Sequence, residues 1–598
     1  MSKTRNHNAD RRDFLLKTTS AVAASSVVAA CGGSDAAPAP APAPAPVLAP
    51  AAAAAPASFA YGVASGDPLA DRVILWTHAK RASDTSPVAL TWQVASESSF
   101  ATVISSGKVD ATEASSFTAK VDATGLTAGA TYFYRFRDAT GATSTVGTTR
   151  TLPANSVAAV KLVVFSCSLY SEGFFNAYAE AAKSDAQYAV HLGDYIYEYG
   201  SDAKKYGNTD AVALGRVVSP ANDMVSLTDY RTRHALYKSD PNLQAAHAKM
   251  PWITVWDDHE FTNDSYVTGA ENHSSATQGD WVTRKNTAAK VYHEWMPIRT
   301  PDASNLLKIY RRFDFGSLLT LHMIDTRIEG RDRQYNSFGD ADGGVARYVA
   351  GITPNAGVLP DASRRMMSTT QQAWLTDGMV ASAATWQFLG NQTVMARMWL
   401  PVSILRAQQG AAQATAIQDY LAAKATPVAN RTAVQTALLD KTTNPGLPFN
   451  LEGWDGYPAN RDSILTNIKS LNKKLVVLSG DSHNGWFTNL TTLAGVKVGV
   501  EFAGSSVTST GFEGVGLGAL GPSLDGSVLG AAAVGQGLGL IDDLNYADTS
   551  RRGYLAITIS AASVKGDYVV VDTVKSKTYK AVVGKTVTVN ASGAITYS

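Results

Sequence analysis

The chain of 598 residues has only two cysteines, Cys31 and Cys167, and almost no excess charge of either sign. It has no uninterrupted apolar run of the roughly 20 residues that a membrane-spanning helix needs. The net charge of +1 favours neither nucleic acid nor an anionic membrane as a partner. Two cysteines also exclude a fold built on a disulfide framework.

The first thirty residues read as an export signal. Residues 11–17 give two arginines, then Asp-Phe-Leu-Leu-Lys, and residues 21–30 are mildly apolar. This arrangement resembles a Tat signal, which passes folded proteins to the Tat export machinery. A chance basic N-terminus is the alternative. We therefore expect export to the periplasm, the cell surface or the medium.

The segment that follows indicates a tether. Residues 28–32, Val-Ala-Ala-Cys-Gly, resemble a lipoprotein processing site, at which Cys31 would carry the lipid. Ordinary cleavage after Ala-x-Ala is the alternative. Residues 38–46 alternate alanine and proline, which is typical of an extended spacer. We assign 1–31 to the signal and 32–58 to the linker, so Cys167 is the single thiol expected in the mature chain.

Two further regions differ in their hydrophobic pattern. Residues 59–153 contain short β-branched runs separated by glycine-containing turns, which predicts a small all-β domain of immunoglobulin or fibronectin type. Residues 154–598 alternate short apolar runs with helical stretches, which predicts an α/β domain.

Four apolar runs of the second region end in residues that bind metals. Ligands of α/β sheets collect outside the carboxyl ends of the strands, so four such endings predict one shared site. The residues concerned are Cys167; Asp194 and Tyr197; Asp257, Asp258, His259 and Asn263; and Asp481 and His483.

These ligand types indicate two unlike metals. Two cations about 3.5–4 Å apart require a bridging carboxylate, and Asp194, which follows Gly193, is the candidate bridge. A thiolate and a phenolate, from Cys167 and Tyr197, suit Fe³⁺. Carboxylate and amide oxygens suit a harder ion such as Ca²⁺.

Several of these residues have an alternative, structural interpretation. Cys167 taken alone is a buried inert thiol. His191 is better placed as a core or supporting histidine, and either Asp257 or Asp258 could cap a following helix. Arg327 ends a fifth apolar run and either binds substrate phosphate or forms a structural ion pair.

The motifs resemble the PhoD family of alkaline phosphatases and phosphodiesterases. The matching segments are 166–167, 191–198, 256–260 and 480–483, with 61–68, 75–77, 325–327, 454–457 and 501–509. The resemblance covers about residues 59 to 575. It implies a calcineurin-like metallophosphoesterase core, a β-sandwich flanked by helices, behind a small N-terminal β-domain.

The resemblance also implies the site. Cys167, Asp194, Tyr197 and His483 would surround Fe³⁺, with Asp194 bridging to Ca²⁺. Calcium would take oxygens from Asp257, Asp258, Asn263 and Asp481.

We therefore expect an exported, monomeric phosphoesterase that hydrolyses small phosphate mono- and diesters by attack of a metal-bound hydroxide. Asp194, His259 and His483 are the expected catalytic residues, with either histidine as the proton donor. One alternative is a phospholipase D-type diesterase acting on phospholipids. The other is a non-catalytic surface-binding protein on a lipid stalk.

Overall fold

The computed structural model describes residues 55–82, 84–334, 363–407, 410–448, 450–514 and 520–598. Ala54–Ser598 form one compact unit. The predicted signal, Cys31 and most of the linker lie outside the described residues. Among the residues described, no helix is both long and apolar enough to cross a bilayer.

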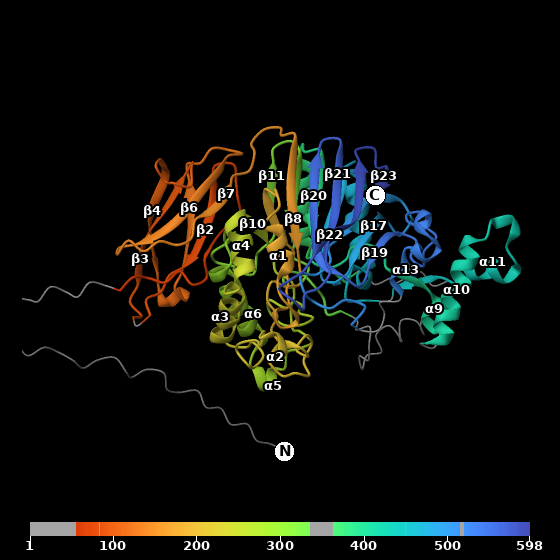
Figure 1. The fold of residues 1–598 in the computed structure, drawn as a ribbon. Helices are drawn as coiled ribbons and strands as arrows, with labels where there is room; N and C mark the ends of the chain where they lie inside the picture. Colours follow the sequence, from red (N-terminus) through yellow and green to blue (C-terminus); the bar gives the residue numbers. More distant parts are fainter. Residues whose placement is uncertain (1–54, 83, 335–362, 408–409, 449, 515–519) are drawn as a thin grey trace, which may run out of the picture. The chain divides into compact units, whose positions relative to one another are not determined.

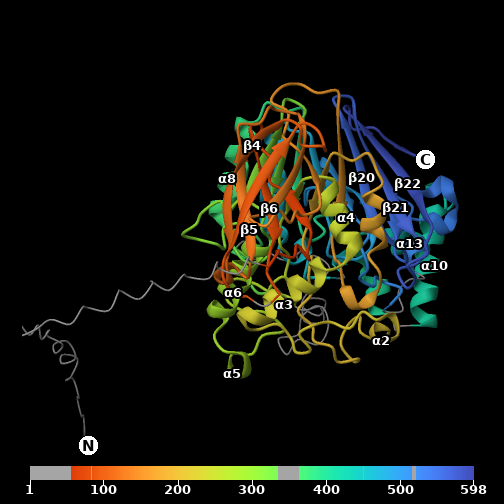
Figure 2. The same cartoon turned by 60° about the vertical axis from the view of Figure 1, so that its left-hand side comes forward.

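The N-terminal region is all-β, as predicted. One sheet of four strands has the order β4-β3-β6-β7, with alternating buried and exposed side chains in β6. Facing it, β1, β2 and β5 belong to a larger sheet, and Val73 and Leu75 of β2 pack with Leu90 and Tyr134 in one core. Figure 2 brings β4, β5 and β6 forward. The bounds are β1 Val63–Gly66, β2 Arg72–His78, β3 Val88–Ala95, β4 Val103–Ala111, β5 Thr118–Thr124, β6 Thr131–Asp138 and β7 Gly147–Arg150.

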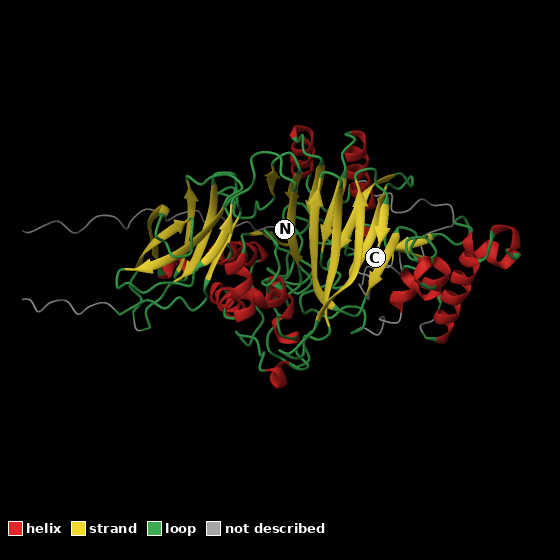
Figure 3. Cartoon of the chain, turned by 45° about the horizontal axis from the view of Figure 1, so that its top comes forward, coloured by secondary structure: helices red, strands yellow, loops and turns green. Residues whose placement is uncertain are grey.

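The larger sheet has ten strands in the order β23-β22-β21-β20-β8-β9-β10-β1-β2-β5. Its centre, β8-β9-β10, is parallel, and the C-terminal strands extend it in antiparallel fashion. Figure 1 shows β8, β20, β21 and β22 side by side, and Figure 3 shows the sheet with its strands in yellow. The bounds are β8 Ala159–Phe165, β9 Tyr188–His191, β10 Trp252–Thr254, β20 Arg552–Ser560, β21 Ser563–Val571, β22 Ala581–Asn590 and β23 Ile595–Tyr597.

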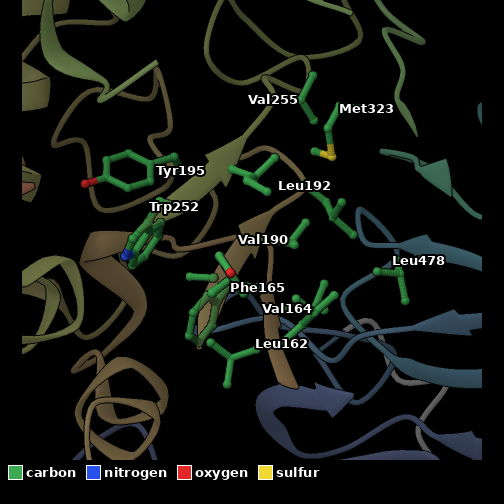
Figure 4. Close-up of a cluster of buried hydrophobic side chains, with 14 of the residues drawn as sticks. Leu162, Val164, Phe165, Val190, Leu192, Tyr195, Trp252, Val255, Met323 and Leu478 are labelled. Carbon is green, nitrogen blue, oxygen red and sulfur yellow. The ribbon is translucent and has the colours of Figure 1, made fainter. Parts of the chain in front are cut away.

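A second sheet of seven strands has the order β11-β12-β13-β16-β18-β17-β19. Its inner face packs against the first sheet: Val476 and Leu478 of β16 share one core with Leu162 and Val164 of β8. Figure 4 shows Leu162, Val164, Val190 and Leu478 in that core. The bounds are β11 Arg311–Phe315, β12 Leu319–Met323, β13 Trp386–Gly390, β16 Leu475–Ser479, β17 Gly485–Thr491, β18 Lys497–Ala503 and β19 Leu544–Asp548.

Helices cover the outer faces of the two sheets. Because side chains alternate along a strand, Leu475 and Val477 of β16 point away from the sandwich and pack with Leu375 of α8 and Leu465 of α12. Ser368 caps α8 by accepting the Gln371 N–H at 3.0 Å. The helices are α1 Asn176–Ala181, α2 Ala211–Leu214, α3 Leu227–Lys238, α4 Pro241–Lys249, α5 Ser275–Gln278, α6 Trp281–Trp295, α8 Thr369–Ala381, α9 Val402–Arg406, α10 Ala411–Ala425, α11 Ala433–Leu439, α12 Pro458–Ser470 and α13 Gly521–Leu524. Strands β14 Trp399–Pro401 and β15 Gly446–Pro448 pair as a short two-stranded antiparallel sheet. The predicted α/β sandwich flanked by helices is confirmed.

Candidate metal centre

The carboxyl ends of β8, β9, β10 and β16 meet at one edge of the sandwich. The ligand residues after these strands form three groups, and within each group the possible ligand atoms lie within 4.8 Å of one another. The groups are Cys167, Asp194 and His483; Asp194, Asp258 and His259; and Asp194, Asp257, Asp258 and Asp481. Asp194 belongs to all three groups, which is the position expected of a bridging ligand.

The backbone is strained at four of these residues. Cys167, Asp194, Asp481 and His483 have φ of 61°, 55°, 62° and 60°, which non-glycine residues seldom adopt. Such strain persists only where the surrounding structure holds it, and it gathers at functional sites.

Gly193 allows two ligand loops to approach each other. Its φ is +111°, and a Cβ built there would lie 2.4 Å from both the Cβ and the backbone N of Asp257. Only a residue without a side chain permits this approach. Gly193 therefore sets the distance between the Asp194 loop and the Asp257 loop.

Glu260 fastens the same two loops together. Its Oε2 accepts the N–H groups of Asp194 at 2.9 Å and of Asp257 at 2.7 Å, and its Oε1 accepts the Tyr195 N–H at 2.6 Å. Glu260 is buried, and burial raises its pKa. Its three donors make it a positioning residue for the ligands, a role that its place after His259 did not indicate.

Tyr197 connects the thiol side of the cluster to Asp194. Its hydroxyl donates to Asp194 Oδ2 at 3.0 Å and accepts from Ser509 Oγ at 2.7 Å. Tyr197 and Cys167 are both fully buried in one small cluster. Burial, and then the charge of Asp194, raises the pKa of each.

His483 is held in one orientation. Its Nδ1 lies 2.9 Å from the Thr510 carbonyl oxygen, so Nδ1 carries the proton and donates it there. The lone pair of Nε2 then faces the cluster, 3.2 Å from the Tyr197 hydroxyl. Tyr206 stacks on the His483 ring, with centroids 6.1 Å apart. This arrangement is the one in which a histidine ligates a metal.

His259 is paired with Glu198. The Nδ1 atom of His259 lies 2.6 Å from Glu198 Oε2, and Glu198 Oε1 accepts from the N–H of Asn263 at 2.9 Å. Burial alone would lower the pKa of His259, but Glu198, Asp258 and Asp194 raise it well above its usual value. Glu198 therefore favours the protonated imidazole.

The charges and the possible ligand atoms of the cluster fit a bound cation. Asp258 Oδ1 is buried and, among the residues described, makes no hydrogen bond, although Arg327 Nη2 lies 3.4 Å from it. Asp194, Asp257, Asp258 and Asp481 lie in one group, and one guanidinium, that of Arg327, pairs with the last three of them. A buried oxygen without a donor costs free energy that a metal ligand bond offsets. The residues present therefore fit a polynuclear metal centre.

Arg327 forms the structural ion pair. It is fully buried and contacts Asp257, Glu452 and Asp481, with the Asp481 contact at 2.7 Å, and Asp258 at 3.4 Å. Phosphate binding by Arg327 stays a prediction. It would require Arg327 to give up one of these carboxylate contacts.

Three other predictions have mixed outcomes. Turns, not a helix, follow Asp257 and Asp258, so the helix-capping alternative is wrong. Asn263 pairs through its amide with Glu271 at 2.6 Å and with Tyr199 at 3.2 Å, and its role as a ligand stays a prediction. His191 lies in the core with its Nε2 2.9 Å from the Tyr178 hydroxyl and its Nδ1 3.3 Å from the Gly193 N–H, and it belongs to none of the three ligand groups.

The chain is similar in sequence and in fold to known proteins. A family model for PhoD-like phosphatases matches residues 162–568, and a model for their N-terminal domain matches residues 43–153. The alkaline phosphatase D of Bacillus subtilis (strain 168) is 33% identical over 473 residues, which cover 76% of this chain and 70% of that protein. A solved structure of PhoD superposes with a TM-score of 0.69 at 28% identity, covering 92% of this chain and 93% of that one.

Proposed function

The chain belongs to the PhoD-like phosphatase family, which makes it a phosphoric ester hydrolase, and we propose that it is exported and cleaves phosphate mono- and diesters at the Asp194 cluster. The observation that carries the proposal is the shared position of Asp194 in three ligand groups. Family membership also removes the alternative of a non-catalytic surface-binding protein.

The proposed metals are Fe³⁺ and Ca²⁺. Fe³⁺ is assigned to Cys167, Tyr197, His483 and Asp194, since a thiol and a phenol lie together in a buried pocket beside a histidine with a free Nε2 lone pair. Bound cations of this kind supply an activated water and offset the charge that develops on the phosphoryl oxygens. Ca²⁺ is assigned to the oxygen ligands Asp257, Asp258, Asp481 and Asn263.

The chain itself supplies the proton. His259 is buried beside Asp194 and Asp258, and Glu198 holds its ring and stabilises its protonated form. We assign to His259 the donation of a proton to the oxygen of the departing alcohol. His483 is left to metal binding, because its Nδ1 proton is committed to the Thr510 carbonyl.

Export belongs to the same proposal. The Tat-type signal and Cys31 support a folded protein that carries its metals across the membrane and is then tethered by a lipid or released. A Cys31→Ala variant, followed by cell fractionation, distinguishes a lipid tether from simple cleavage.

The function is tested by metal analysis and by one assay on the purified protein. We expect iron and calcium, together with release of p-nitrophenolate from both p-nitrophenyl phosphate and a p-nitrophenyl diester. Zinc as the only metal, or a protein inactive on both esters, would overturn the proposal. A phospholipase D-type enzyme would instead release choline from phosphatidylcholine and leave the small esters uncut.

A further inference from the structure

A cavity of about 240 Å³ adjoins the cluster next to Asp481. Asp481 and Ser482 line the cavity on the side of the metal centre, and Met398, Trp486 and Phe512 are among its other lining residues. Asp481 is also a member of the third ligand group. Asp481 therefore places the cavity directly beside the candidate metal centre.

Part of the cavity lining is apolar and aromatic. Trp486 and Phe512 pack edge to face with ring centroids 5.6 Å apart, and Trp486 and Met398 are almost completely buried. Apolar faces arranged in this way bind apolar groups and aromatic rings.

The polar groups of the same part of the lining are already paired. The Trp486 indole N–H donates to Ser482 Oγ at 2.8 Å. The Asp455 carboxylate accepts the Met398 N–H at 2.8 Å and the Trp399 indole N–H at 3.0 Å. A polar ester group would therefore gain little here, whereas an apolar group would be removed from water.

We propose that this cavity binds an apolar ester substituent of a phosphodiester, of the size of one aromatic ring or a short alkyl chain. The inference rests on the proposed function and names the class of substrate. The volume supports the size limit, because a cavity of about 150 Å³ holds one benzene molecule.

The test compares two diesters with one leaving group, phenyl p-nitrophenyl phosphate and methyl p-nitrophenyl phosphate. In both, water adds to phosphorus and the bond to p-nitrophenolate breaks, so only the retained substituent differs. After each rate is divided by its hydroxide-catalysed rate, we expect kcat/KM to be at least about 10-fold higher for the phenyl ester.

Two variants locate this preference. Phe512→Ala and Met398→Ala each remove part of the apolar cavity lining, and in each the phenyl-to-methyl ratio should fall towards one. Leu529→Ala, at an exposed position outside the cavity lining, is the control and should keep the ratio.

The outcomes separate the two proposals. A ratio near one in the unmodified protein overturns the inference while the enzyme remains a phosphodiesterase. A high ratio that neither variant lowers also overturns it, because the preference then arises elsewhere. If neither diester is cleaved, the proposed function fails and the inference fails with it.

Discussion

Glu260 accepts the main-chain N–H of Asp194 at 2.9 Å through the same oxygen that accepts the N–H of Asp257 at 2.7 Å. Asp194 follows β9 and Asp257 follows β10, so one buried carboxylate joins the ends of two neighbouring parallel strands. The separation of two candidate metal ligands therefore depends on a residue that is itself outside the ligand groups.

Glu260→Gln should weaken metal binding and activity by about 10- to 100-fold, the usual cost of losing a residue that orients metal ligands. In this variant the side-chain amide places its NH₂ group against at least one of the three backbone N–H groups. Two donors then face each other, and that hydrogen bond is lost. The measurement is kcat/KM together with iron and calcium content at limiting metal, with exposed Glu113→Gln as the control. Full metal content and activity in Glu260→Gln would show that the carboxylate does not position the loops.

Cys167→Ala should remove iron and reduce kcat by at least about 100-fold, because a neutral methyl group cannot replace an anionic sulfur ligand. Visible absorbance from a phenolate bound to Fe³⁺ should disappear with the iron. The checks are absorption spectra and iron analysis of purified protein. A variant that kept its colour, iron and activity would mean that Cys167 is only a buried thiol.

His259→Asn should slow substrates with alkyl leaving groups far more than those that release p-nitrophenolate. An alkoxide needs a proton to depart and p-nitrophenolate does not, so we expect a loss of about 10²- to 10⁴-fold for the alkyl esters only. Glu198→Gln should show the same selectivity with a smaller loss. Equal losses for both kinds of leaving group would assign His259 to metal binding instead of proton donation.

Removal of calcium should lower both turnover and thermal stability. Without Ca²⁺, Asp257, Asp258 and Asp481 repel one another around Arg327. When the free calcium concentration is 100 times the Kd, binding raises the free energy of unfolding by about 2.7 kcal/mol. EGTA should therefore lower the Tm by about 2–5 °C, and added calcium should restore it. Rates and Tm that do not change after exhaustive EGTA treatment would exclude a calcium site.

The sequence predicted the residues that gather at the strand ends better than the residues that support them. Cys167, Asp194 and Asp481 were found because each ends an apolar run, and the carboxyl ends of strands share one edge. Glu198 and Glu260 were missed because they act through hydrogen bonds to loops that no periodic pattern describes. The cavity was missed for a similar reason: Met398, Trp486 and Phe512 lie far apart along the chain and meet only after folding.

Gly193→Ala should disrupt the metal centre more than replacement of a glycine elsewhere, because it combines an unfavourable backbone conformation with a steric clash. Its φ of +111° is unfavourable for alanine, and the added Cβ would lie 2.4 Å from the backbone N of Asp257. Gly125→Ala separates these costs, since Gly125 also has a positive φ, +78°, but nothing lies within 4 Å of its added Cβ. The control should lose about 1–2 kcal/mol of stability and keep its metals and activity. Gly193→Ala should in addition bind less iron and calcium and lose most of its kcat/KM. If both variants lost only stability, to the same extent, the close approach of the Asp194 and Asp257 loops would not be what builds the site.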